Sequence, residues 1–109
     1  MMKQLLKDVE QLTEKEYALA SKDHGAQFHS PHEAYAVIKE EVEEAQDELR
    51  VIEDRLTDEF WRGVKYDSTF TCNYNAKIIY DRAVSAAAEC IQVAAMACKS
   101  LKGYEVDKK

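Results

Sequence analysis

The chain has 109 residues, of which 33% are charged and 46% hydrophobic, and its formal net charge is -6. This composition indicates a folded, acidic protein of one domain (1–109), and it excludes a disordered tail. The lack of a basic patch argues against nucleic acid as a partner. Residues 1–25 are charged and amphipathic, and no run of eighteen uncharged apolar residues follows, so we expect a cytoplasmic protein with no membrane partner.

The first predicted helix runs from about residue 3 to residue 22, because leucine and valine side chains recur there at helical spacing. The pair His24-Gly25 closes it, since glycine readily adopts the backbone conformation that follows a helix. A second helix begins at Pro31. Ser30 is its expected N-cap, and Glu33 stands where a capping box requires a carboxylate.

The second helix should continue for roughly 25 residues, because an apolar stripe recurs along it at helical spacing. The stripe consists of Ile38, Val42, Ala45, Leu49, Ile52 and Leu56. From Thr57 to Asn75 the pattern breaks into aromatic and turn-forming residues, which predicts an irregular connection with a short helix or turn. Trp61 lies in this connection. Its indole would either stack on a nucleotide base or join a small satellite core.

A third helix is predicted from about Ala76 to Lys102, rich in alanine, serine and cysteine, which lets a neighbouring helix approach closely. No sustained alternation of apolar and polar residues competes with the helices, so the predicted class is all-α. The third helix is apolar nearly all round, and the other two helices of the chain cannot cover it alone. We therefore expect a helical bundle completed by oligomerisation, as a homodimer or homotetramer.

Two short acidic patterns suggest a chemical site. Glu40-Glu41-x-x-Glu44 lies on the second predicted helix, and Glu89-x-x-Gln92 lies on the third, where Glu89 is the only charged residue between 83 and 98. A buried carboxylate costs several kcal/mol unless it is paired, protonated or bound to a metal.

A helical wheel places the acidic residues relative to the apolar stripe. Glu41, Glu44 and Glu48 fall beside the stripe on one side, whereas Glu40, Glu43 and Asp47 point towards solvent. Any one glutamate of this kind is ordinarily part of a solvated helix face. As a group facing Glu89 and Gln92, however, Glu41 and Glu44 would offer the oxygen ligands that Mg²⁺ or Mn²⁺ prefers.

The order and spacing of these motifs resemble those of the all-α nucleoside triphosphate pyrophosphohydrolases of the MazG type, which include dimeric dUTPases and dCTP pyrophosphatases. The E-E-x-x-E motif is followed about 45 residues later by E-x-x-Q, and the resemblance covers about residues 28–101. The resemblance implies that Glu41, Glu44 and Glu89 are metal ligands and that Glu40 assists the metals or the attacking water. One departure is clear, because Gln92 stands where the family pattern has an aspartate ligand. We expect the side-chain oxygen of Gln92 to be the fourth metal ligand, although a neutral amide binds a cation more weakly than a carboxylate does.

The segment Phe28-His29-Ser30-Pro31 is similar to an F-H-x-P segment of the dCTP pyrophosphatase branch. The resemblance implies that Phe28 and His29 help to hold the base. Judged from the sequence alone, the three histidines 24, 29 and 32 are more typical of capping and surface positions than of a zinc site, because they lack a fourth ligand.

The activity that the resemblance implies is Mg²⁺-dependent hydrolysis of a nucleoside triphosphate between the α and β phosphorus atoms, giving a monophosphate and pyrophosphate. Glu40 or Glu44 would accept the proton of the attacking water. Two alternatives stay open: a non-catalytic helical protein that senses nucleotides or binds partners, and a structural bundle in which Glu89 pairs with a basic side chain of a neighbour.

Overall fold

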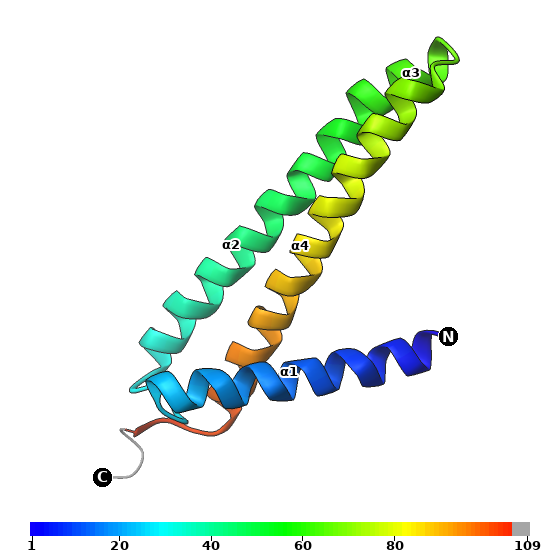
Figure 1. Cartoon of the computed structure of the whole chain (residues 1–109). Helices are drawn as coiled ribbons and strands as arrows, with labels where there is room; N and C mark the ends of the chain where they lie inside the picture. The colour runs from blue at the N-terminus through cyan, green and yellow to red at the C-terminus, as the bar shows by residue number, and fades with distance from the viewer. Residues whose placement is uncertain (106–109) are drawn as a thin grey trace. The chain divides into compact units, whose positions relative to one another are not determined.

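The computed structural model describes residues 1–105, and these residues are helical over most of their length (Figure 1). The elements are α1 (Met2–His24), α2 (Pro31–Arg55), the π-helical turn η1 (Leu56–Phe60), α3 (Trp61–Lys65) and α4 (Thr69–Leu101). The structure is 88% helical and has no strand in the described range, which confirms the all-α prediction. The chain divides into two compact units. Unit 1 comprises residues 1–42 and the described residues from 89 onwards, and unit 2 comprises residues 43–88.

The junction between α1 and α2 follows the predicted capping. Gly25 ends α1 at φ 88° and ψ 159°, and its backbone N–H donates to the Ser21 carbonyl. At the start of α2, the backbone N–H of Glu33 donates to the Ser30 hydroxyl at 3.3 Å, which confirms Ser30 as the N-cap. The Glu33 carboxylate accepts the backbone N–H of His29, so the reciprocal bond of the capping box forms one residue earlier than predicted.

The core of unit 1 forms around Phe28, which is 2% exposed. Buried Ala34 of α2 and buried Ala95 and Met96 of α4 complete it, and partly buried side chains pack against them. These are Tyr17, Ala20, Val37, Ile38 and Tyr104. The small alanines let the helices approach the aromatic ring closely, as the composition of the third predicted helix indicated.

The segment after α4 crosses the Phe28 end of this core. Phe28 and Tyr104 form an isolated backbone bridge, and the backbone N–H of Glu105 donates to the Phe28 carbonyl at 3.0 Å. Lys99, only 5% exposed, holds its ammonium 4.6 Å from the centre of the Phe28 ring. A cation over an aromatic face is attracted by the ring quadrupole, which offsets part of the cost of burying the charge.

Unit 2 corrects the prediction of an irregular connection from Thr57 to Asn75. The chain stays helical through η1 and α3, turns within residues 66–68, and enters α4 at Thr69, seven residues before the predicted start. Ser68 is the N-cap of α4, because its hydroxyl accepts the backbone N–H of Thr71 at 3.2 Å. The later part of α2, α3 and the first part of α4 thus make a helical hairpin (Figure 1).

Close helix contact holds this hairpin together near its turn. Gly63 is buried, and a Cβ atom placed there would lie 2.8 Å from the Sγ atom of Cys72. At the turn itself Asp67 adopts φ 51°, a left-handed conformation that aspartate tolerates better than most residues.

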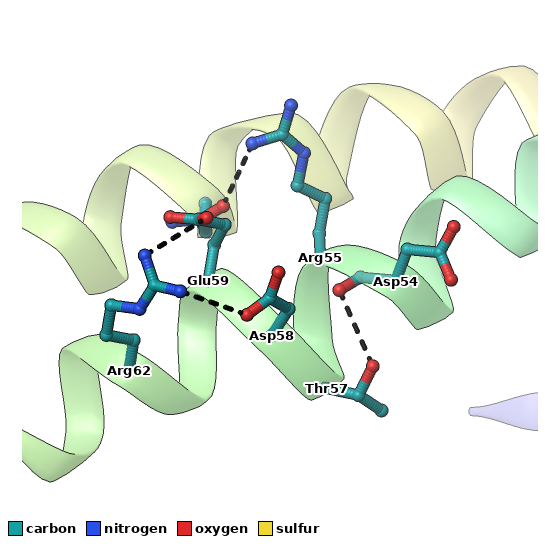
Figure 2. A network of polar contacts seen from close by, with 7 residues as sticks. Asp54, Arg55, Thr57, Asp58, Glu59 and Arg62 are labelled. Carbon is teal, nitrogen blue, oxygen red and sulfur yellow. Dashed lines mark hydrogen bonds and ion pairs between the residues drawn. The ribbon is translucent and has the colours of Figure 1, made fainter.

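Polar contacts organise the π-helical turn of unit 2. Figure 2 shows Arg62 reaching Asp58 and Glu59, with nitrogen–oxygen distances of 3.4 and 3.5 Å. The Thr57 hydroxyl donates to the Glu53 carbonyl at 2.9 Å, a local side-chain bond that competes with regular helical bonding. Bonds of this kind are often found where a helix bends or departs from regular geometry.

The buried residue Asn75 links α4 to α2 within unit 2. Its amide nitrogen donates to the Thr71 carbonyl at 2.8 Å, and its amide oxygen accepts a long bond of 3.5 Å from Arg55. Both ends of this 1% exposed side chain are therefore satisfied.

The helix α4 is long and apolar enough to cross a membrane by length and composition, a test that core helices of soluble proteins also pass. In the most apolar stretch of 18 residues of this helix, 22% is buried within the described chain.

Candidate metal centre

Three glutamate carboxylates of α2 and α4 gather into one acidic cluster. Glu41 of α2 and Glu89 of α4 both belong to unit 1 and are half-buried, and Glu44 follows Glu41 by one turn of the continuous helix α2. One carboxylate oxygen from each of the three lies within 4.8 Å of the others. Helical spacing explains the pair on α2, since residues three apart share a face.

Glu89 is flanked on α4 by the small residues Ala88 and Cys90. The carboxylate is half-buried and makes no hydrogen bond or ion pair with another described residue. Within residues 1–105, therefore, no basic side chain neutralises Glu89. The structural alternative, in which Glu89 pairs with a lysine or arginine, would need a cation from a second molecule.

Gln92 lies one turn after Glu89 and contacts a residue that the sequence analysis did not single out. Its amide nitrogen donates to a carboxylate oxygen of Glu16 at 2.6 Å, so the bond joins α4 to α1. Both side chains are half-buried. Glu16 is one of several glutamates on α1, and no local pattern distinguishes it from the others, because its partner is 76 positions away in sequence.

The neighbouring acidic residues are placed as the helical wheel indicated. Glu40, Glu43 and Asp47 are exposed, whereas Glu48 is half-buried. Within unit 2 the Glu48 carboxylate accepts a hydrogen bond from Arg82 at 3.3 Å, so the third glutamate beside the apolar stripe is held in an ion pair. Glu40 is adjacent to the cluster in sequence but occupies a different face of α2.

The residues predicted to hold a base have different environments. Phe28 is a core residue, and its ring is covered by Lys99. The His29 imidazole is 71% exposed and lies 3.3 Å from Glu33 and 3.5 Å from Glu105, contacts that become ion pairs when the ring is protonated. Trp61 is 55% exposed on unit 2. Of the three side chains, His29 and Trp61 are accessible to a ligand, and a role in base binding stays a prediction for all of them.

Lys77, a basic side chain of α4, forms an ion pair within unit 2. Its ammonium donates to Asp81 at 2.9 Å, and this hydrogen bond, with the attraction of the same carboxylate, raises the pKa of Lys77. Because its pKa is raised, the lysine keeps its charge to a higher pH than an isolated one.

The donor set at the acidic cluster suits a hard divalent cation. Carboxylate oxygens from Glu41, Glu44 and Glu89 are the ligands that Mg²⁺ and Mn²⁺ select, and an exposed member such as Glu44 leaves room for water or substrate oxygens. Zinc sites in proteins, by contrast, usually include sulfur or imidazole donors. Comparison of the chain with protein-family models, curated proteins and solved structures gives no match.

Proposed function

We propose that this protein is a Mg²⁺-dependent nucleoside triphosphate pyrophosphohydrolase that cleaves between the α and β phosphates and releases a monophosphate and pyrophosphate. The observation that carries the proposal is the meeting of Glu41, Glu44 and Glu89, carboxylates from two helices, within 4.8 Å of one another. The motif order that resembles the MazG type supports the same reaction.

In this proposal Glu41 and Glu89 hold the cation from the half-buried side, and Glu44 holds it from the exposed side. When bound, Mg²⁺ supplies the positive charge that an acidic protein needs to bind a triphosphate, and it makes water a better nucleophile. Glu40 or Glu44 would accept the proton of the attacking water, since both are solvent-accessible carboxylates of α2.

A second candidate function is that of a non-catalytic protein, which senses nucleotides without turnover or binds partners. It is favoured by the neutral Gln92 at the position where the family pattern has an aspartate, because a cation held by fewer negative charges is bound more weakly. A sensor of this kind would bind nucleotide and Mg²⁺ but release no pyrophosphate.

The test is pyrophosphate release from a panel of ribo- and deoxyribonucleoside triphosphates, with and without Mg²⁺. We expect Mg²⁺-dependent release with at least one nucleotide, abolished by Glu41→Ala. A matched control is Glu43→Gln, which removes an exposed carboxylate two positions along α2 and should leave release unchanged. No release by the folded protein with any nucleotide would overturn the enzyme proposal; nucleotide binding without release would then favour the sensor.

The proposal includes a cytoplasmic homodimer or homotetramer. Large apolar side chains on both units are exposed, among them Leu19 at 60%, Phe70 at 81% and Tyr80 at 65%. Burying such side chains against a second copy would stabilise an assembly by about 25 cal/mol per Å² of apolar surface. We expect sedimentation in detergent-free buffer to give a dimer or tetramer at micromolar concentration; a monomer there would contradict this part of the proposal.

A further inference from the structure

The amide of Gln92 has two ends with opposite chemistry. Its nitrogen only donates hydrogen bonds, whereas its oxygen only accepts them and can coordinate a cation. A glutamine can therefore replace a ligand carboxylate only if its oxygen, and not its nitrogen, is available to the cation. Something in the structure has to select between the two orientations of the amide.

Glu16 makes this selection. Its ionised carboxylate can only accept hydrogen bonds, and it lies 2.6 Å from the amide nitrogen of Gln92. The opposite orientation would bring the amide oxygen against the carboxylate and lose the bond. The contact lies between half-buried side chains of α1 and α4, where a charge-assisted hydrogen bond is stronger than in water.

The carbonyl oxygen of Gln92 is consequently turned away from Glu16. No described residue donates a hydrogen bond to this oxygen, and Gln92 stands one helical turn after Glu89, on the same side of α4. Glu16 also forms no ion pair with a basic side chain among residues 1–105.

We propose that Glu16 is a positioning residue, which fixes the Gln92 amide so that its carbonyl oxygen serves as a neutral ligand of the cation held by Glu41 and Glu89. The proposal rests on the function proposed above. It explains how this chain keeps an oxygen donor at the position where the family pattern has an aspartate. The Glu16 charge also polarises the amide and makes its carbonyl oxygen a better donor to a cation.

The experiment measures binding of Mn²⁺ alone by electron paramagnetic resonance, with the full chain and no nucleotide. Glu16→Ala should weaken Mn²⁺ binding about tenfold or more, the usual effect of losing a residue that orients a metal ligand. Glu14→Ala, which removes an exposed carboxylate of the same helix, should leave binding unchanged. Circular dichroism verifies that each variant keeps its helix content.

Two further variants separate orientation from a merely structural contact. Glu16→Gln allows either orientation of the Gln92 amide, so about half of the molecules would present oxygen and binding would weaken roughly twofold. The double variant Glu16→Gln/Gln92→Glu restores the hydrogen bond with donor and acceptor exchanged and places a carboxylate at position 92. It should bind Mn²⁺ at least as tightly as the unaltered protein.

Glu41→Gln distinguishes the two levels of the proposal. If Glu41→Gln leaves Mn²⁺ binding unchanged, the cation site itself is wrong, and the proposed function falls with it. If Glu41→Gln weakens binding while Glu16→Ala does not, only the positioning role of Glu16 is overturned. Equal weakening by Glu14→Ala and Glu16→Ala would also overturn that role, since it would indicate a general loss of negative charge.

Discussion

The two units bury different kinds of side chain. Unit 1 encloses large apolar groups, Phe28 and Met96, between helices that carry alanine at the contacts. In unit 2 the buried residues are Ala45, Gly63, Asn75 and Ala86, which are small or polar. Burial of apolar area thus stabilises unit 1, whereas close helix approach and satisfied polar groups stabilise the hairpin of unit 2.

Many large apolar side chains of unit 2 lie on its surface, whereas others, such as Ile52, Phe60 and Ile78, are half-buried. The exposed ones are Leu49, Leu56, Trp61, Val64, Tyr66, Phe70, Tyr74, Tyr80 and Val84. The buried Phe28 ring of unit 1 and an exposed ring of unit 2 should therefore differ sharply in their contribution to stability, and substitutions can test this difference directly.

The largest effect is expected from Phe28→Ala. Removing a fully buried aromatic ring should lower the free energy of unfolding by about 3–5 kcal/mol, because it loses apolar burial and leaves a cavity. Phe70→Ala, at an 81% exposed position of unit 2, should change it by about 0.5 kcal/mol or less at protein concentrations where the chain is monomeric. Urea unfolding followed by circular dichroism measures both. Similar losses for the two variants would contradict the contrast between the units.

A smaller effect is expected at two of the three glycines, Gly25 and Gly63, for different reasons. Gly25→Ala meets no atom within 4 Å, but it would force alanine to φ 88° and ψ 159°, at a cost of about 1–3 kcal/mol. Gly63→Ala has an ordinary helical backbone but meets the Sγ atom of Cys72 at 2.8 Å, and after the gain in helix propensity the net loss should be about 1–2 kcal/mol.

The reason for each loss can be checked with one added substitution. Cys72→Ala removes the sulfur atom, so it should recover part of the stability lost in Gly63→Ala and none of that lost in Gly25→Ala. Thermal unfolding midpoints of the single and double variants provide the measurement. If Cys72→Ala fails to relieve Gly63→Ala, the helices of the hairpin are not as close as the structure places them.

The smallest effects are expected at the helix caps. Ser30→Ala and Ser68→Ala each remove a hydroxyl that accepts a backbone N–H, at 3.3 and 3.2 Å, and each should lower stability by about 1 kcal/mol. Amide hydrogen exchange resolves where the loss occurs. Faster exchange should appear at the start of α2 for Ser30→Ala and at the start of α4 for Ser68→Ala, whereas uniform acceleration in both variants would be inconsistent with local caps.

Local signals located most of the helices but misplaced the start of α4. The Ser30-Pro31 cap and the glycine after His24 correctly placed the boundaries of α1 and α2. The aromatic segment 57–75 reads as irregular because its apolar residues do not form a stripe, yet tertiary packing at Gly63 and the Ser68 cap keep it helical. Asp67-Ser68 was the available signal for a helix start there. The prediction of a single domain stays a prediction beside the two compact units.

The sequence by itself determined the helical class, the caps of α2 and the identity of the acidic residues on each helix face, because capping and helical periodicity depend on neighbours within one or two turns. Only the tertiary structure decided that Glu41 and Glu89 meet, that Phe28 belongs to the core, and that Gln92 binds Glu16. These contacts join residues far apart in the chain. The fit of one helix surface against another selects them, and no local pattern encodes that fit.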